Sequence, residues 1–556
     1  MFDRRTLLQS GLSFFGSYAF TTAFAAKVRK NEWSTNGKLI TTHADRAHLL
    51  RANINHTPTS TRKIETLIIG GGISGLSAGW WLQKKGLNDF LIVDLDQDVG
   101  GNSQSSKNHI SPFPWGAHYL PIPSSTSLYV KDFLRDVGVI KGMDQDGLDI
   151  YNPEYLCADR QERLFFKGSW QDSLIPQKYL TQDELQQFAN FHSYIEIWKN
   201  KIGRDHKPAF AIPVAFSSQD PEFLELDNIS FATLATSQGW TSKPLDWYLN
   251  YCCKDDYGRG IHEVSAWSGI HYFAARSGIG SNTESHSVLT WPEGNGWLVQ
   301  QFEKILTGKI ERSKLAIHIN TKSHQLFADI LSFKDGSVER VYATDIIYAG
   351  HRLSAANVID QYKESRPAFL QNMEYAPWLV ANVSIEGLSE DEREDQAWDN
   401  VNYYQESLGY IVADHQNITT RHHANTVLTY FKTLDSFDPK TSRLEAGLKS
   451  HQDWSEMIRQ DLAKTQPRIA EKITNIDCKV WGHGMIYPKV GYIWGKDRNK
   501  RFESLGRLHF AHSDMSGISI FEEAQYQGVE AANKVIQLQA SSHHRSAANT
   551  PENNVY

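Results

Sequence analysis

A glycine-rich turn between a strand and a helix constrains this chain more than any other feature. The run 64–69 is apolar and rich in β-branched residues, as expected for a buried parallel strand. Gly70, Gly72 and Gly75 follow directly with G-x-G-x-x-G spacing. Such a turn brings a phosphate close to free backbone N–H groups at the start of the next helix. The pattern therefore predicts a nucleotide-binding strand, turn and helix.

The residues after the turn complete a βαβ unit. The segment 76–85 is predicted to be helical, and Gly86 ends it. The run 90–93 is predicted to be a second strand, and it ends in Asp94. This acid lies nineteen positions after Gly75, where a carboxylate that binds ribose hydroxyls is expected. These features indicate a dinucleotide, but alone they do not separate FAD from NAD.

A glycine pair beyond this acid makes the prediction more specific. Gly100 and Gly101 begin six residues after Asp94, and the loop 115–121 follows. At these residues the chain resembles the flavin-containing amine oxidase superfamily, in which such a pair lies under the flavin. The resemblance implies FAD as the cofactor. Many members have arginine after the pair, whereas this chain has Asn102, so an arginine–phosphate contact is not expected there.

The resemblance returns in later parts of the chain. The segment 289–298 resembles the loop that leads back to the FAD domain, and 343–350 resembles a strand whose glycine approaches the cofactor. The run 507–511 resembles the last strand, and Asp514 is then implied as a partner of a ribityl hydroxyl or the pyrophosphate side. The helix expected after residue 516 would point its N-terminus at the flavin N1–C2 edge, where reduced flavin gathers negative charge. An ordinary C-terminal helix is the alternative.

The resemblance thus implies an α/β fold with a Rossmann-like FAD-binding domain and an interleaved α+β substrate domain. We expect FAD-binding segments at 61–140, 286–360 and 491–540, and substrate segments at 141–285 and 361–490. The implied cofactor-binding residues are Gly70, Gly72, Ile73, Ser74, Gly75, Asp94, Leu95, Gly100, Gly101, Asn102, Ala117, His118, Gly350, Asp514, Ile520 and Phe521.

The catalytic candidates lie mostly in one segment before the last strand. In the superfamily this region, here 480–488, passes over the flavin. His483 is a candidate base or substrate anchor, and Trp481 and Tyr487 are candidate pocket walls. His118 is a fourth candidate, and for each of the four a packing role is the alternative. No His/Cys grouping in the sequence indicates a metal site.

These features favour the oxidation of a small molecule by FAD. By resemblance we expect an amine, polyamines included, whose C–H bond next to nitrogen passes a hydride to flavin N5 before the imine hydrolyses. Related flavoproteins desaturate or isomerise hydrophobic polyenes or oxidise porphyrin precursors, and a redox-inactive flavin protein is a further alternative. An acidic, aromatic-lined pocket would favour amines, and a wide apolar tunnel would favour polyenes. The electron acceptor (oxygen, quinone or cytochrome) stays open.

The first 25 residues predict an export signal. Arg4 and Arg5 precede two leucines and a weakly apolar stretch, and 23–25 provides a small-x-small cleavage site. The arrangement resembles the twin-arginine signal, which exports folded proteins, and therefore predicts a periplasmic enzyme loaded with its cofactor beforehand. Asp3 departs from the usual pattern, and an ordinary amphipathic helix is the alternative. We expect a linker at 26–60 and a disordered polar tail at 541–556.

Composition narrows the partners. The net charge of −7 gives no reason to expect nucleic acid or an anionic membrane. No segment of the sequence reaches eighteen apolar residues, so a stable membrane span is not expected. The four cysteines form no CxxC pattern, although a disulfide between Cys157 and Cys478 is compatible with an oxidising compartment. The 16 Trp and 23 Tyr residues either fill a core or line a pocket for a planar or cationic ligand.

Overall fold

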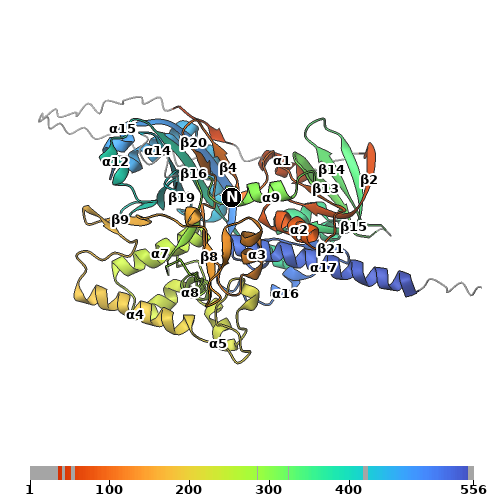
Figure 1. Ribbon diagram of the computed structural model, residues 1–556, viewed down its shortest axis with the longest axis horizontal. Coiled ribbons are helices and arrows are strands. Elements are labelled where there is room, and N and C mark those ends of the chain that lie inside the picture. The colour runs from red at the N-terminus through yellow and green to blue at the C-terminus, as the bar shows by residue number, and fades with distance from the viewer. Residues whose placement is uncertain are drawn as a thin grey trace, which may run out of the picture. The chain divides into compact units, whose positions relative to one another are not determined.

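The computed structural model describes residues 36–40, 44–51, 57–284, 286–322, 325–416 and 424–548, and two large sheets organise them (Figure 1). Within these residues the first sheet has seven strands: β2 (Ser60–Ile69), β3 (Phe90–Val93), β12 (Ile310–Glu311), β13 (Lys314–Asn320), β14 (Phe327–Ser332), β15 (Val338–Tyr348) and β21 (Leu508–Phe510). The second has eight described strands: β1 (Leu39–Ile40), β9 (Glu162–Phe166), β10 (Ser169–Asp172), β16 (Tyr375–Ile385), β17 (Asp399–Asn402), β18 (Gly409–Val412), β19 (Thr426–Thr433) and β20 (Ile473–Ile486).

The remaining elements connect or cover these sheets. The α-helices are α1 (Ala44–His48), α2 (Ile73–Lys84), α3 (Leu128–Asp136), α4 (Gln182–Lys199), α5 (Pro221–Leu224), α6 (Phe231–Ser237), α7 (Lys243–Tyr257), α8 (Ala266–Ala274), α9 (Gly296–Ile305), α10 (Arg352–Val358), α11 (Asp360–Glu364), α12 (Glu390–Glu394), α13 (Pro439–Leu448), α14 (His451–Ala463), α15 (Pro467–Glu471), α16 (Arg498–Phe502) and α17 (Phe521–Ala548). The short strands are β4 (Ser105–Lys107), β5 (Pro112–Pro114), β6 (Tyr119–Pro121), β7 (Ile140–Met143), β8 (Asp149–Tyr151) and β11 (Val288–Thr290).

The first sheet has a parallel centre. β2 pairs in parallel with β3 on one side and with β15 on the other, and β15 also pairs in parallel with β21. β13 and β14 extend the sheet in antiparallel fashion from β15. Because the carboxyl ends of parallel strands meet at one edge, the loops after β2, β3, β15 and β21 gather there. The predicted α/β class with a Rossmann-like domain is confirmed.

Two helices fix this edge by close packing. Every residue of α2 from Ile73 to Leu82 is buried, so this helix shows no amphipathic pattern. The last helix, α17, packs against it. A Cβ on Gly528 would lie 2.1 Å from the Ser74 carbonyl oxygen, and the Trp81 indole donates a 2.7 Å hydrogen bond to the Asn533 side chain. The C-terminal helix therefore supports the glycine-rich turn near the start of the chain.

The second sheet is covered on both faces. Alternate residues of β16 enter two different cores, as the period of a strand dictates. Leu379 and Val383 pack with Trp454 of α14, whereas Trp378 and Val380 join the aromatic core that includes residues of α4, α7 and α8. In Figure 1 these three helices lie together below the second sheet. A strand buried on both sides explains the nearly continuous apolar run in this part of the sequence.

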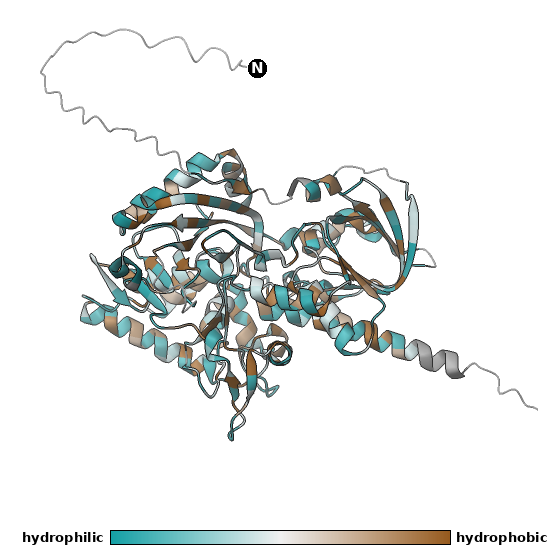
Figure 2. Ribbon diagram, turned by 45° about the horizontal axis from the view of Figure 1, so that its top comes forward, coloured by the Kyte–Doolittle hydropathy of each residue, from teal (hydrophilic) through white to brown (hydrophobic). Residues whose placement is uncertain are grey.

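The helix α4 shows the amphipathic pattern that α2 lacks. Phe188, Phe191, Ile195 and Trp198 are its buried residues, and their spacing of three and four follows one helical face. A capping box at Thr181 begins the helix. Figure 2 shows the result as brown and teal residues that alternate along the helix.

Two segment predictions are wrong in part. The expected linker 26–60 contributes β1, which pairs in parallel with β20 at the edge of the second sheet, and also helix α1. The expected disordered tail is helical through Ala548, because α17 continues beyond residue 541. Residues 549–556 and the export signal at 1–25 lie outside the described residues. The strands of the two sheets alternate along the chain, and the exact segment boundaries stay a prediction.

All four cysteines are free thiols, so the disulfide that the sequence left open between Cys157 and Cys478 is not formed. Among the described residues, no helix combines the length and the apolar character that a membrane crossing requires.

Candidate functional site

The carboxyl edge of the first sheet brings the predicted dinucleotide residues together. Tyr348 of β15 lies beside Ile69 of β2, so Gly350 follows next to Gly70. A Cβ on Gly70 would lie 2.9 Å from the Ala349 backbone, and the residue has a φ of 111°, which favours glycine. At this edge the backbone of Gly70 therefore lies too close to the backbone of Ala349 for a side chain to fit between them.

Two glycines of the turn have opposite surroundings. A Cβ on Gly75 would lie 1.8 Å from the Gly70 carbonyl oxygen, so only glycine lets the helix pack on the strand. A Cβ on Gly72 would meet nothing within 4 Å. Gly72 is also the N-cap of α2, and it has no side chain that could accept a hydrogen bond. The first backbone N–H groups of the helix, near Ile73 and Ser74, are therefore not capped by this residue. An open space at an uncapped helix N-terminus is suited to a pyrophosphate.

Asp94 lies at the end of β3, where the sequence predicts it. Its two carboxylate oxygens accept hydrogen bonds from the backbone N–H groups of Gly71 at 2.5 Å and Asp96 at 2.8 Å. Burial raises its pKa to about 6, although these hydrogen bonds act in the opposite direction. Each oxygen retains a second lone pair for a ribose hydroxyl. Leu95 follows directly and is half-buried.

The glycine pair continues the same surface. Gly100 bonds to the Gly71 carbonyl through its N–H at 2.8 Å and forms a bridge with Gly72. Gly101 and Asn102 then begin a short 3-10 turn. The Asn102 side-chain amide donates a hydrogen bond to the Gly484 carbonyl oxygen of β20. This bond links the dinucleotide edge to the second sheet.

Asp514 lies in a polar cluster at the end of β21. Its carboxylate accepts hydrogen bonds from the backbone N–H of Arg352 at 3.0 Å and from the Tyr375 hydroxyl at 2.5 Å. Burial favours a higher pKa, but the adjacent His512 and His351 hold the pKa of Asp514 well below its usual range. His351, His512 and Asp514 bring ligand atoms within 4.8 Å of one another, a grouping with metal-ligand chemistry that the sequence did not indicate. Its place beside Gly350 assigns it to the dinucleotide edge.

These residues fit FAD. The open space at Gly72, the half-buried acid Asp94 and the buried acid Asp514 follow β2, β3 and β21, whose carboxyl ends lie at one sheet edge. The buried Asp514 Oδ1 atom lies 3.0 Å from the His512 Nδ1 atom, and it keeps a lone pair for a ligand hydroxyl.

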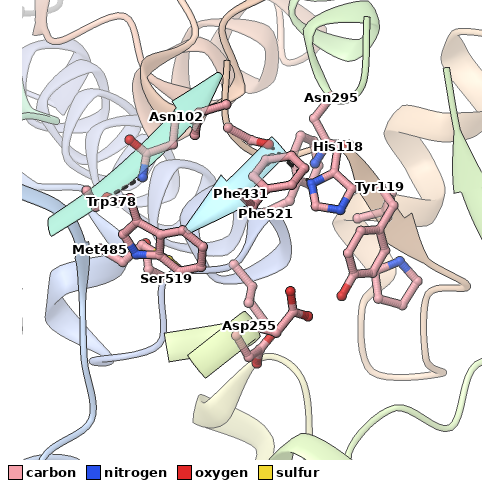
Figure 3. Close-up of a pocket in the computed structure, with 18 of the residues that line it drawn as sticks. Asn102, His118, Tyr119, Asp255, Asn295, Trp378, Phe431, Met485, Ser519 and Phe521 are labelled. Carbon is pink, nitrogen blue, oxygen red and sulfur yellow. Dashed lines mark hydrogen bonds between the residues drawn. The ribbon is translucent and has the colours of Figure 1, made fainter. Parts of the chain in front are cut away.

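A cavity of about 920 Å³ lies beside this edge (Figure 3). Its ring-bearing walls are His118, Tyr119, Trp378, Phe431, Trp481 and Phe521. Its charged residues are Asp255, Asp256, Arg276 and Glu522. The remaining lining residues are Asn102, Gly116, Ala117, Leu120, Pro121, Asn295, Val380, Gly484, Met485, Ser519 and Ile520. Five of the predicted cofactor-binding residues therefore line it: Asn102, Ala117, His118, Ile520 and Phe521.

The carboxylates of the cavity differ in their partners. Asp256 forms an ion pair with Arg276. Asp255, one residue earlier on α7, has no such pair within 4 Å among the described residues. Figure 3 shows its carboxylate facing the space between Trp378 and Tyr119. Burial and the charge of Asp256 raise the pKa of Asp255 to about 7, against the opposing effects of Arg276 and the nearby Tyr119 hydroxyl.

His118 is a neutral wall of this cavity. Its ring stacks on Phe431, with ring centroids 4.4 Å apart, and its Nδ1 lies 3.3 Å from the Gly116 carbonyl oxygen. Burial lowers the pKa of His118 to about 4, so the imidazole carries no proton charge at neutral pH. A neutral imidazole in this position can accept a proton but does not repel a cation.

The other catalytic candidates divide into two groups. Trp481 lines the cavity, and its indole donates a 2.6 Å hydrogen bond to the Trp115 carbonyl. His483 and Tyr487 are not among the described lining residues. The His483 side chain is exposed, and the Tyr487 hydroxyl donates to Glu374 at 2.6 Å. In a regular strand, alternate residues such as 481, 483 and 487 would share one face. The pairing of β16 with β20 shifts its register between the Trp378–Trp481 and Ala376–Met485 pairs, and this irregularity interrupts the alternation, so the segment does not place all three side chains at one cavity.

The sequence analysis missed the acids of the cavity. One signal for Asp256 was available, because Leu249, Cys252, Cys253 and Asp256 follow the spacing of one buried helical face. A charged residue at a core position of an otherwise apolar face indicates a functional or paired group. Asp255 has no comparable signal, since its exposure to the cavity depends on segments far away in the chain.

Comparisons with known proteins agree with this architecture. A family model described as NAD(P)-binding Rossmann-like domain matches residues 68–137. Flavin-containing amine oxidase B of Bos taurus is 22% identical over 280 residues, which is 49% of this chain and 48% of that protein. The chain thus spans about half the length of the curated relatives it matches. A solved structure of a putrescine oxidase double mutant covers 86% of this chain and 100% of its own, with a TM-score of 0.64 and 16% identity.

This chain has the fold of putrescine oxidase. The comparisons support the resemblance to flavin-containing amine oxidases that the sequence indicates. The same fold also occurs in a fatty acid isomerase from P. acnes, with a TM-score of 0.59 and 13% identity over 85% of this chain and 98% of that protein. Since one fold serves both chemistries, the lining of the cavity has to distinguish between them.

Proposed function

We propose that this protein is an FAD-dependent oxidoreductase that oxidises a small amine, polyamines included. The observation that carries the proposal is the cavity beside the dinucleotide edge. Its walls are aromatic, and the half-buried carboxylate of Asp255 faces into it without an ion-pair partner within 4 Å among the described residues. Glu522 also lines the cavity without an ion pair among the described residues, and an aromatic enclosure with unpaired acids favours an organic cation over a neutral polyene.

The dinucleotide edge would hold the cofactor. The turn at Gly72 and the N-terminus of α2 receive the pyrophosphate, Asp94 receives the adenosine ribose, and Asp514 receives a hydroxyl on the flavin side. When bound, FAD supplies the acceptor for a hydride from the carbon next to the substrate nitrogen. The chain's own residues position the substrate and exclude water.

Asp255 attracts and orients the ammonium form of the substrate. With a pKa of about 7 the carboxylate is partly protonated when the cavity contains no cation. A bound ammonium favours the ionised form and lowers this pKa, since an opposite charge stabilises the carboxylate. Oxidation requires the neutral amine, and the same carboxylate is an available proton acceptor for that step.

Arg276 neutralises the second acid, Asp256, so that Asp256 does not compete with Asp255 for the substrate ammonium group. Its guanidinium pairs with Asp256, and it also lowers the pKa of the buried Glu522 against the stronger effect of burial. The aromatic walls exclude water and so strengthen the attraction between Asp255 and a cation.

The proposal is tested by substrate reduction of the purified holoprotein without oxygen. We expect amines to bleach the flavin absorbance, and alcohols of the same carbon skeleton to leave it unchanged. In Asp255→Asn the affinity for the amine should fall roughly ten- to hundredfold, because a charge-assisted contact contributes about 1.5–3 kcal/mol. Asp172→Asn is the matched control, since the Asp172 side chain is 80% exposed on β10.

The same measurement separates the alternatives. Bleaching by a polyene or a porphyrin precursor, with none by any amine, would contradict the amine proposal and favour the chemistry of the isomerase-like proteins. A flavin that no compound reduces would indicate a redox-inactive binding protein. Equal affinity of Asp255→Asn and the native protein for amines would remove Asp255 from substrate recognition.

We also propose that the protein is exported in folded form to the periplasm, which rests on the Arg4-Arg5 signal of the sequence. The test is fractionation of bacteria that express the full chain and the double variant Arg4→Lys/Arg5→Lys. We expect the native chain in the periplasm with FAD bound and the variant in the cytoplasm. The same distribution for both chains would refute export by this route.

A further inference from the structure

A second cavity, of about 420 Å³, lies beside the loop that joins β20 to α16. Arg498 and Arg501 line it together with Lys496, Tyr492 and Phe369. We propose that this cavity binds a small oxyanion, that is, a phosphate, sulfate or carboxylate group. The proposal does not depend on the amine oxidation proposed above.

Arg501 provides the main observation. Its side chain is 2% exposed, and its Nη2 donates hydrogen bonds to the carbonyl oxygens of Tyr492 at 2.8 Å and Ile493 at 2.9 Å. Its Nη1 is buried and has no hydrogen-bond partner in the protein. An unsatisfied buried donor on a cation is costly, so a ligand acceptor in the adjacent cavity would remove a real penalty.

Arg498 adds a second cation to the lining of the same cavity. It donates to the Ile493 carbonyl through Nη1 at 2.8 Å, while its Nε and Nη2 make no hydrogen bond to the described protein. Burial and the charge of Arg501 lower the pKa of Arg498 to about 10. Arg501 is buried and Arg498 is half-buried, and two guanidinium groups that repel each other are stabilised by an anion that contacts both.

No carboxylate of the described residues lies in direct contact with either arginine. Neither Arg498 nor Arg501 has a carboxylate within 4.0 Å among the described residues. Asp497 also lines the cavity, but it pairs with Lys500 at 3.5 Å. Asp227 and Glu523 favour the charged form of Arg498 only through longer-range attraction. Asp227 also attracts Arg501 in this way. No carboxylate therefore contacts either guanidinium group directly, and their free N–H groups are left for a ligand.

The geometry of the two arginines limits the chemical class of that ligand. The Arg501 guanidinium lies over the Tyr492 ring, with its Cζ atom 4.1 Å from the ring centroid. The Arg498 guanidinium lies over the Trp494 ring, with its Cζ atom 4.2 Å from the centroid. Stacking fixes the planes of the guanidinium groups, so that the free N–H groups keep their direction. Planar forks of this kind match the oxygens of phosphate, sulfate and carboxylate, whereas a chloride ion would use only one donor at a time.

The site is connected to the dinucleotide edge by one residue. The Tyr492 hydroxyl donates a 2.9 Å hydrogen bond to the Asp514 carbonyl oxygen. An anion that holds Arg501 in place also holds the Tyr492 carbonyl and ring. Occupancy of the cavity should therefore slow the release of FAD as well as raise thermal stability.

The experiment is a titration of the holoprotein with inorganic phosphate, sulfate and succinate in separate series at constant ionic strength set by chloride. Calorimetry should show saturable binding at one site for at least one of the three, and the series that saturates identifies the oxyanion. A linear rise of the melting temperature with salt and no saturable heat in any series would overturn the proposal, because that is the response to a salt excluded from the surface.

Variants locate the binding. Arg501→Lys keeps the charge but not the fork, and should weaken the saturable binding at least tenfold. Arg498→Met is a second variant that leaves the bonds of Arg501 intact, and it should weaken binding by a similar factor. Arg204→Met is the control, because the Arg204 side chain is 80% exposed elsewhere. Unchanged binding in both Arg501→Lys and Arg498→Met would overturn the assignment to this cavity.

Discussion

The dinucleotide edge offers mainly backbone groups to a ligand, whereas the aromatic cavity offers mainly side chains. The edge is built from glycines and helix N–H groups within 25 residues of one another, from Gly70 to Asp94, and later loops complete it. The cavity is built from single side chains of α7, β6, β16, β19, β20 and α17. The edge is therefore a general device for a nucleotide, whereas the cavity holds the information about the substrate.

The largest effect is expected where the edge depends on the absence of a side chain. Gly72→Leu should leave the apoprotein folded, since a Cβ there meets nothing within 4 Å, but its side chain would fill the space for the pyrophosphate. We expect the affinity for FAD to fall roughly a hundredfold, about 2.7 kcal/mol, measured by titrating the apoprotein with FAD and following the flavin fluorescence.

Gly75→Ala is the contrasting variant at the same turn. Its Cβ would lie 1.8 Å from the Gly70 carbonyl oxygen, so the helix must move away from the strand. We expect the free energy of unfolding of the apoprotein to fall by about 1–3 kcal/mol, measured by urea denaturation. If Gly72→Leu destabilises the apoprotein as much as Gly75→Ala, the open space at Gly72 is not a ligand site.

The second effect concerns charge in the cavity and its dependence on pH. Asp255 has a raised pKa of about 7, so it gains negative charge as the pH rises through that value. The affinity for tetramethylammonium, a cation that does not titrate, should increase by up to tenfold across this range and then level off. Spectral titration of the holoprotein measures it.

The control for this pH dependence is Asp255→Asn, which should bind the cation weakly at every pH. His118 is not expected to contribute, because its pKa of about 4 keeps it neutral throughout the range. A pH dependence that persists in Asp255→Asn would assign the titrating group to Glu522, whose pKa burial also raises to about 7.

A smaller effect is expected at the aromatic wall. Phe431→Leu removes the stacked ring beside His118 but keeps an apolar side chain in the cavity. Aromatic pairs contribute about 0.5–1.5 kcal/mol beyond their buried area, so the KM for an amine should rise by roughly two- to tenfold while kcat changes less. A loss of kcat alone would indicate that Phe431 orients the reacting bond rather than binding the cation.

The smallest effect is expected at the bond between the two regions. Asn102→Ala removes the hydrogen bond to the Gly484 carbonyl, which joins the glycine pair to β20. A neutral hydrogen bond contributes about 1 kcal/mol, which corresponds to roughly a fivefold change in FAD affinity, measured by dissociation under dilution. Asn88→Ala is a suitable control, because its side chain bonds only locally to the Gly86 carbonyl at an exposed position.

The two regions also differ in how far the sequence predicted them. The turn, the ribose acid and the glycine pair are close in the chain, and their spacing was enough to place them at one edge. The prediction was less successful where it grouped residues by segment, because Trp481 lines the cavity while His483 and Tyr487 do not. Residues 481, 483 and 487 would share one face of a regular strand, but the register between β16 and β20 shifts within this segment, and the sequence does not reveal that irregularity.

The sequence by itself determined the parallel strand, the glycine turn and the acid after the second strand, because these use local backbone conformations that few residue types allow. Only the tertiary structure decided that Asp255 faces an aromatic space while Asp256 is neutralised by Arg276, since Asp256 lies in α7 and Arg276 lies after the end of α8. The charge that a buried carboxylate retains depends on every neighbour within several ångströms, and the order of residues along the chain does not specify those neighbours.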